Sequence, residues 1–483
     1  QYRSLQCARR TGAGVPRVAT RQAVVVIHGM GEQRPLGTLR SFISAAVPVP
    51  DDPKAPLYWS KPDAFGNEFE LRRFTVASSR DRPVTDVFEY YWADKMTGTK
   101  LRQLLPLAKA LLRRLPWRVP ANLVAFYLLG WLLVLLVISA ALRLANSLGP
   151  VALLDGVDVL KKAADGHGQL TGWLIVAILV LTGSATTFAV NTFGDVARYL
   201  DAAPGNVGVR HAIKADGLEM LRKIQNSGQF DRIVVVGHSL GSIIALDLLG
   251  YLWGEQYSQH AAIDRPNQDA LLKVQELGQK LATTTAPSDE QVTEFQLAQR
   301  ELWREQRRHG NPWLITDLIS AGSPLTHAAL LLAPNQAALR ERQARYEVPM
   351  NPPVADDGIY SHLAAVYEAG DPVRKNSIRV LNSGAMFGCT RWTNIWFPCR
   401  YGLFGDPFGG PLQPLFGNGI LDRPVTEGPN WRFVPVLPHV SYWRGSSAKL
   451  AHANIALVRA ALDLGSTGWL ANSPDRPVPP AKP

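Results

Sequence analysis

The chain has 483 residues, of which 46% are hydrophobic and 19% are charged, a composition typical of globular proteins. Its formal net charge of +11 fits binding to nucleic acid, binding to anionic lipid, or a role in solubility alone. The sequence has no zinc finger, RNA-binding aromatic motif or lysine-rich tract, which argues against nucleic-acid binding. Three cysteines, Cys7, Cys389 and Cys399, are too few for a disulfide framework and match no metal-site spacing.

The N-terminal part predicts a basic tail followed by buried strands. Residues 1–21 carry five arginines. The stretch "QAVVVIHGMGEQ", residues 22–33, is a continuous apolar run that ends in a glycine-rich turn. Unbroken runs of this kind are typical of strands buried on both faces of a parallel sheet. The turn lacks the Lys-Ser/Thr ending of a phosphate-binding loop. A second strand is predicted over residues 87–93.

Two uncharged apolar segments predict a transmembrane hairpin. Residues 121–142 contain thirteen Leu, Ile, Val or Phe side chains, worth about −4 to −8 kcal/mol on the insertion scale. Their length matches the hydrocarbon thickness of a bilayer. Residues 170–190 are also uncharged, with small and hydroxyl side chains that suit packing against a partner helix. A pair of helices buried in a soluble protein, or an apolar lid over an active site, are the alternatives.

Basic residues near the hairpin predict its orientation. Six precede the first segment without an acid among them, whereas the loop between the segments has balanced charge. Both flanking halves are therefore expected to face the cytoplasm. The stretch "KLRQLLPLAKALLRRLPW", residues 100–117, alternates bases with leucines, as either an interfacial helix or an ordinary surface helix would. The six basic residues are Lys100, Arg102, Lys109, Arg113, Arg114 and Arg118.

Beyond the hairpin, strands alternate with helices, which predicts an α/β fold with a mainly parallel sheet. Strands are expected at 232–236, 313–325, 377–384, 390–397 and 431–438, and helices at 208–225, 240–253 and 447–464. The polar segment 255–311 is helix-prone, and a cap over the site, an interaction surface and a solvated excursion all fit it. A proline-rich tail follows at 467–483.

"DRIVVVGHSLGS", residues 231–242, places Gly-x-Ser-x-Gly between a buried strand and a helix. In this context the motif predicts a nucleophile elbow, a tight turn that exposes Ser239. The alternative is a plain strand-to-helix turn. A serine hydroxyl is a weak nucleophile unless a base takes its proton, so a histidine must lie near it in the fold.

The sequence resembles the α/β-hydrolase superfamily, and within it the lipase- and esterase-like serine hydrolases. The resemblance rests on "IHGMG", "GHSLGS", "SAGSPL" and "HVSYW", which occur in the family's order. It covers residues 20–45, 84–95, 205–253 and 313–460. It implies an α/β-hydrolase fold and a Ser-His-Asp triad that requires no metal or organic cofactor.

The family's base comes late in the chain, after the acid. His439, in "VLPHVSYW", precedes the expected terminal helix and is the predicted base, while His452 is the alternative. His327 comes too early. His28 and His238 belong to the first loop and the elbow, where a structural role is expected.

The predicted acid is Asp406, in "YGLFGDPFGG", although eight residues separate it from the strand ending in "WF", which departs from the usual family pattern. Asp371 and Asp317 are the alternatives. The other aspartates between serine and base read as turn or cap residues. The oxyanion hole is expected to use the backbone amides of Leu240 and Met30.

The resulting organisation is a basic tail (1–21), the first part of the hydrolase domain (22–99), an interfacial helix with the transmembrane hairpin (100–195), the elbow segment (196–254), a helical insertion (255–311), the C-terminal part of the domain (312–466) and the tail (467–483). The expected function is hydrolysis of carboxylic esters, acyl lipids above all, by a protein anchored in a membrane, which fits a bacterial inner membrane. An acyltransferase or thioesterase with the same triad, or a non-catalytic membrane scaffold, are the alternatives. The oligomeric state cannot be read from the sequence.

Overall fold

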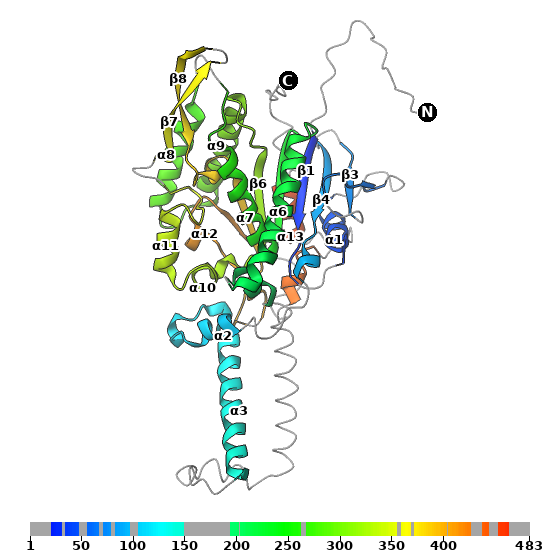
Figure 1. Cartoon of the computed structure of the whole chain (residues 1–483), viewed down its shortest axis with the longest axis vertical. Coiled ribbons are helices and arrows are strands. Elements are labelled where there is room, and N and C mark those ends of the chain that lie inside the picture. Colours follow the sequence, from blue (N-terminus) through cyan, green and yellow to red (C-terminus); the bar gives the residue numbers. More distant parts are fainter. Residues whose placement is uncertain are drawn as a thin grey trace.

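The computed structural model describes the backbone of most of the chain, and the structural statements below concern these residues: 21–30, 34–47, 56–66, 71–78, 83–96, 105–148, 194–201, 203–261, 267–354, 359–368, 371–402, 404–426, 437–443 and 453–462. Within them the protein is an α/β fold around an eight-stranded, mostly parallel sheet (Figure 1). The fold class expected from the sequence is confirmed at this level.

The strand order in the sheet is β10-β9-β6-β5-β1-β4-β3-β2. From β10 to β4 all neighbours are parallel, whereas β3 and β2 add an antiparallel edge. The strands are β1 (Arg21–Ile27), β2 (Trp59–Pro62), β3 (Arg72–Val76), β4 (Val84–Tyr90), β5 (Arg232–His238), β6 (Ile315–Ala321), β9 (Arg391–Trp396) and β10 (Leu421–Pro424).

The central strands are apolar on both faces because helices cover both sides of the sheet. In β1, Val25 and Ile27 join one core cluster, while Val24 and Val26 join the other. This alternation is the period-2 geometry of a strand whose two faces are both buried. The carboxyl ends of β1, β5, β6 and β9 therefore meet at one edge, where an open α/β sheet binds its ligands.

Helices α6 (Pro204–Asn226) and α7 (Leu240–Gln256) lie in the first core cluster, and α1 (Gly37–Ala46) and α13 (Ala453–Leu462) in the second. Arg459 of α13 donates to the carbonyl oxygens of Ala45 and Ala46 at the end of α1. Two segments that lie more than 400 residues apart in the sequence thus cover one face together. Further helices are α2 (Leu105–Leu112), α3 (Val124–Leu148), α8 (Asp269–Thr283), α9 (Asp289–Arg308), α10 (Ala328–Leu331), α11 (Gln336–Ala344) and α12 (Gln413–Phe416), and residues 194–200 are also helical.

Two strand predictions differ from the structure. The strand predicted at 377–384 is β8 (Asp371–Leu381), which pairs with β7 (Ser361–Glu368) as a separate two-stranded antiparallel sheet. An apolar run shows that a strand is buried but not which strand it pairs with. Of the strand predicted at 431–438, residues 437–438 begin the short 3-10 turn η8 (Leu437–Val440), and the rest lies outside the described residues.

The predicted helical insertion contains the α8–α9 pair, and it is packed rather than solvated. Ser288 starts α9 with a capping box, in which its side chain and that of Gln291 satisfy each other's backbone amides. Phe295, Leu302 and Trp303 of α9 are buried in the first core cluster. The insertion is therefore part of the main core and supports the β9 end of the sheet.

The predicted apolar segment 121–142 lies largely in α3, which projects away from the body next to α2 (Figure 1). The second predicted segment, 170–190, lies outside the described residues. Among the helices that the structure describes, none is long and apolar enough to cross a membrane.

Candidate active site

Ser239 sits at the sharp turn between β5 and α7. Its backbone has φ 51° and ψ −126°, a conformation that side-chain-bearing residues rarely adopt. Such strain persists only where the surrounding structure holds it, and the nucleophile elbow is one such place. The backbone N–H of Ser239 donates to the carbonyl of Ala321 at the end of β6, and its own carbonyl accepts from Ser242 at 2.9 Å.

Gly241 allows the turn to pack against the neighbouring strand. A Cβ at this position would lie 2.2 Å from the carbonyl oxygen of Ile27 and 2.5 Å from that of His28. Both contacts are with backbone, so no side-chain rotation could relieve them. The second glycine of the motif therefore lets the start of α7 cross directly over the end of β1.

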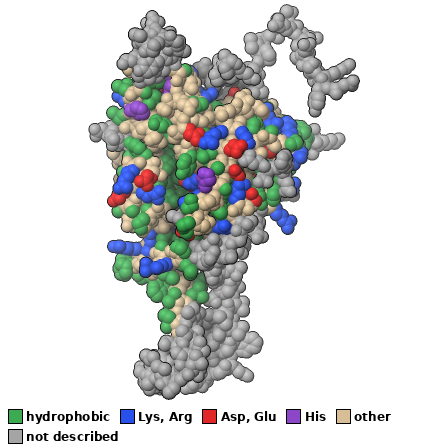
Figure 2. Space-filling model, viewed as in Figure 1, with side chains coloured by type: hydrophobic (Ala, Val, Ile, Leu, Met, Phe, Trp, Pro, Cys, Tyr) green, Lys and Arg blue, Asp and Glu red, His purple; other side chains and the backbone are tan. Residues whose placement is uncertain are grey.

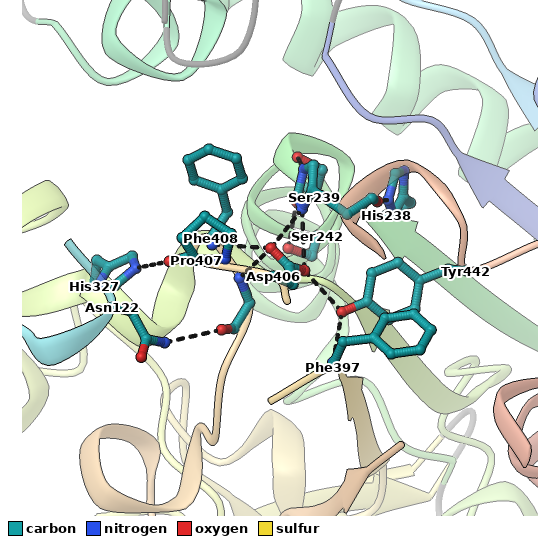
Figure 3. A network of polar contacts seen from close by, with 12 residues as sticks. Asn122, His238, Ser239, Ser242, His327, Phe397, Asp406, Pro407, Phe408 and Tyr442 are labelled. Atoms are coloured by element: carbon teal, nitrogen blue, oxygen red, sulfur yellow. Dashed lines mark hydrogen bonds and ion pairs between the residues drawn. The ribbon is translucent and has the colours of Figure 1, made fainter. Parts of the chain in front are cut away.

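The structure brings Ser239, His439 and Asp406 together in one hydrogen-bonded chain (Figure 3). His439 Nε2 lies 2.9 Å from Ser239 Oγ, and Nδ1 lies 3.0 and 3.1 Å from the two carboxylate oxygens of Asp406. A carboxylate only accepts hydrogen bonds, so Nδ1 carries the proton and Nε2 is free to accept one from the serine. All three side chains are buried.

The surroundings of Asp406 keep it ionised. Burial alone would raise the pKa of this carboxyl, but the adjacent His439 and hydrogen bonds from His439, Tyr442 and Gly409 lower it below its usual value overall. The amides of Phe408 and Gly409 donate to Oδ1 at 2.9 and 3.0 Å. The Tyr442 phenol donates to Oδ2 at 2.8 Å.

The gap between the predicted strand end and Asp406 is accommodated by a small loop that folds back on itself. Beyond the end of β9, Arg400 and Phe404 pair antiparallel and return the chain to the sheet edge. His327 Nε2 then donates to the carbonyl of Pro407 at 2.9 Å. Asn122, just before α3, donates to the carbonyl of Gly409 at 3.3 Å. Two distant segments therefore hold the loop around Asp406, residues 404–410, which we call the acid loop (Figure 3).

His28 and His238 are neutral structural residues around the site. His28 donates from Nδ1 to the carbonyl of Gly29 and accepts from the Trp92 amide at Nε2, and burial lowers its pKa to about 4. His238 donates from Nε2 to the carbonyl of His439 at 2.8 Å. Burial, and then repulsion from His439, lower the pKa of His238 to about 4. The elbow thereby fixes the backbone of the candidate base.

The predicted oxyanion loop passes beside the elbow. A Cβ on Gly29 would lie 2.8 Å from His238 Nδ1 and 3.0 Å from Ser239 Cβ, which measures how closely the loop approaches. Met30 follows it and is half-buried. Leu240 begins α7, where backbone amides and the helix dipole favour negative charge.

The alternative residues lie elsewhere. Asp317 is at the start of β6, where it forms an ion pair with Arg391 at 2.5 Å, far from the carboxyl ends of the strands. Asp371 begins β8 in the separate sheet. His452 lies outside the described residues. Among the side chains that the structure describes, no group of His, Cys, Asp and Glu is arranged to hold a metal ion.

Three residues around the site were not predicted from the sequence: Tyr442, Phe408 and Ser242. Tyr442 lies in the motif "HVSYW", three residues after His439, and this proximity in sequence could have indicated that it lies near the site. The Phe408 ring stands edge-on to the His439 imidazole, with centroids 4.8 Å apart. Ser242 bridges the elbow to the segment that follows β6, because its hydroxyl bonds the Ser239 carbonyl at 2.6 Å and the Ser323 hydroxyl at 2.7 Å.

Comparison with models of protein families, with curated proteins and with solved structures gives no match for this chain.

Proposed function

We propose that this protein is a serine hydrolase of the α/β-hydrolase type that cleaves carboxylic esters through an acyl-enzyme. The observation that carries the proposal is the buried chain from Ser239 Oγ through His439 to Asp406, with links of 2.9 and 3.0 Å. A nucleophile, a base within hydrogen-bond reach of it and a third group that orients the base are the elements of this catalysis.

In the first half-reaction, Ser239 Oγ attacks the ester carbonyl while His439 Nε2 takes the hydroxyl proton. Asp406 holds the Nδ1–H tautomer and stabilises the positive charge that develops on the imidazole. The tetrahedral intermediate collapses when His439 returns that proton to the departing alcohol. Ser239 is then acylated.

In the second half-reaction, water attacks the acyl-enzyme and His439 acts as base again. The carboxylic acid leaves and the serine hydroxyl is regenerated. The amides of Leu240 and Met30 are the proposed donors to the oxyanion in both steps, because Leu240 starts α7 and the Gly29–Met30 loop lies beside the elbow. Loss of one such donor typically lowers the rate by about two to three orders of magnitude.

Access to the serine is restricted. Ser239 is only 1% exposed and the catalytic imidazole is also buried. An ester reaches Oγ only when neighbouring side chains move aside, and a dry site strengthens the charge interactions of the transition state. The rate of hydrolysis is therefore expected to depend on how readily the side chains around Ser239 move aside.

Labelling of the full chain by a fluorophosphonate probe tests the proposal, since the probe reacts covalently with activated serines. Labelling is expected in the wild type and absent from Ser239→Ala and His439→Ala. Ser242→Ala is the matched control, because Ser242 is a buried serine of the same turn that is bonded to Ser239 O and Ser323 instead of to the imidazole.

A folded wild-type protein that never labels, or labelling that persists in Ser239→Ala, would overturn the proposed function. Where labelling is lost as expected, incubation with a panel of esters and analysis of the products follows. Release of free acid identifies hydrolysis, whereas transfer of the acyl group to another alcohol or thiol would replace hydrolysis by acyl transfer.

A further inference from the structure

Near one end of the molecule, α2, the turns that follow it and the start of α3 expose a group of large apolar side chains. We call residues 105–138 the α2–α3 surface. Trp117 is 76% exposed, and its exposed apolar companions lie on both α2 and α3. Globular proteins rarely expose so many large apolar side chains together unless they contact a partner. The exposed set includes Leu105, Leu115, Trp117, Leu128, Trp131 and Leu135.

The charge of this surface is entirely positive. Residues 105–148 contain no Asp or Glu. Lys109, Arg113 and Arg118 are exposed beside the apolar side chains, and blue and green side chains adjoin each other below the body in Figure 2. Apolar side chains with exposed tryptophan, flanked by Lys and Arg, match the layering of an anionic lipid bilayer, with an apolar interior under negative head groups.

The α2–α3 surface is also joined to the body and to the active-site loop. Arg114 donates to the carbonyl of Ala329 at 2.6 Å, and Tyr127 of α3 donates to the carbonyl of Arg114, which ties α2 and α3 together. Phe126 of α3 contacts Phe408 of the acid loop, with ring centroids 5.8 Å apart. Phe408 in turn stands against the imidazole of His439. Only two ring contacts separate α3 from the candidate base.

Asn122 provides a second, polar link. Its side-chain amide donates to the carbonyl of Gly409, and the amide of that same glycine donates to Asp406 Oδ1. A displacement of the start of α3 would therefore act on the residues that hold the acid and pack against the base. Because Ser239 is buried, neighbouring side chains must move before a substrate reaches it. The contacts of Phe126 and Asn122 with the acid loop allow a partner bound to the α2–α3 surface to affect that movement.

We propose that the α2–α3 surface docks on a bilayer that contains anionic lipid, and that Phe126 and Asn122 connect it to the acid loop, so that the enzyme takes acyl esters of lipids held in that bilayer. The substrate class rests on the proposed serine-hydrolase function. The docking itself does not.

Cosedimentation of the full chain with vesicles tests the docking. Phosphatidylcholine vesicles with and without phosphatidylglycerol are compared for the wild type, for Lys109→Glu/Arg113→Glu/Arg118→Glu and for a control. The control, Lys61→Glu/Lys280→Glu/Arg308→Glu, makes the same change of net charge at exposed residues outside the surface. The surface variant is expected to bind anionic vesicles about 100-fold more weakly, while the control binds like the wild type.

Activity is measured on two substrates, a fluorescent acyl ester embedded in the anionic vesicles and water-soluble p-nitrophenyl acetate. The surface variant should lose hydrolysis of the embedded ester in proportion to its binding and keep hydrolysis of the soluble one. Equal wild-type binding to both vesicle types, or equal loss in the control, overturns the docking. Docking with hydrolysis of the soluble ester only overturns the substrate class. Docking without any labelling or hydrolysis overturns the proposed function alone.

Discussion

The phenol of Tyr442 donates a 2.8 Å hydrogen bond to Oδ2 of Asp406, so the segment that supplies the candidate base also supplies a donor to its acid. The same hydroxyl accepts from the Phe397 amide at 3.0 Å, which fixes its direction. Burial raises the pKa of Tyr442 well above its ordinary value, so the phenol stays protonated and remains a donor. Tyr442 is a positioning residue for the carboxylate.

Tyr442→Phe should lower kcat/KM about 10-fold, because a hydrogen bond to a buried charged group contributes about 1.5–3 kcal/mol. The acidic limb of the pH–rate profile should move to higher pH, since a carboxylate with one donor fewer holds the protonated imidazole more tightly. Steady-state kinetics across the pH range measure both effects.

Tyr360→Phe is the matched control for this hydroxyl deletion. Tyr360 is also buried, and its hydroxyl has no hydrogen-bond partner within the described part of the chain. Its removal should leave the rate and the pH profile unchanged. A Tyr442→Phe variant with a lower rate but an unshifted profile would assign Tyr442 to packing alone.

Asp406→Asn should lower kcat by about four orders of magnitude, because an amide in place of the carboxylate stabilises the wrong imidazole tautomer and no longer offsets its charge. Asp422→Asn is the control. Asp422 is a half-buried carboxyl that accepts from the amides of Leu412 and Gln413 and from Asn394 instead of from the imidazole. The control should lose thermal stability while its kcat stays within about 10-fold of the wild type. Similar losses of kcat in the two variants would count against Asp406 as the triad acid.

Much of the sheet could be predicted from the sequence, because β1 and β5 contain continuous valine-rich runs. Strands β6 and β9 mix polar residues with β-branched and aromatic ones, which also favour strands. The sequence does not show which strands pair with each other. The order of β8 relative to β9 depends on tertiary contacts, and β8 joins β7 instead of the main sheet. Strand β2 is exposed along its whole length, so no apolar pattern marks it.

In the candidate site, too, local motifs mark some residues, whereas other contacts depend on the folded chain. Ser239 is marked by its local motif, and it lies within hydrogen-bond distance of the predicted His439, which pairs with Asp406. Their catalytic roles stay predictions. The contacts that hold them could not be read locally, since Asn122 reaches Gly409 across 287 residues of sequence. Such contacts exist only after the chain has folded.

Gly241→Ala should abolish activity and prevent normal folding of the elbow, because its Cβ would lie 2.2 Å from the carbonyl oxygen of Ile27. Gly250→Ala, about two and a half turns further along α7, is the control. It has nothing within 4 Å of the added Cβ, and alanine is the better helix former by about 0.8–1 kcal/mol. Thermal melts and fluorophosphonate labelling distinguish them, with a higher melting temperature and full labelling expected for the control. A labelled, stable Gly241→Ala protein would contradict the close approach at the elbow.

Glu89, near the end of β4, is a buried carboxyl beside the loop that leads into α1. Its Oε2 accepts from the Leu36 amide at 2.6 Å, just before α1. Burial raises its pKa to about 7, although hydrogen bonds from Leu36 and Leu39 act in the opposite direction. The folded protein therefore binds this proton more tightly than the unfolded chain does, between pH 4.5 and about 7.

Wild-type stability should accordingly lose about 3 kcal/mol through Glu89 as the pH rises across that window, since a raised acid pKa favours the folded state only while the group is protonated. Glu89→Gln keeps an acceptor for the Leu36 amide and has no proton to lose. Histidines whose pKa is lowered by burial, such as His28, His238 and His327, contribute in the opposite direction. The quantity to measure is therefore the difference in unfolding free energy between variant and wild type, by denaturant titration at each pH. That difference should shift in favour of the variant as the pH rises from 4.5 to about 7, and it should stay level above that pH. A difference that stays constant from pH 4.5 to above 7 would show that Glu89 ionises in the folded protein as easily as in the unfolded chain.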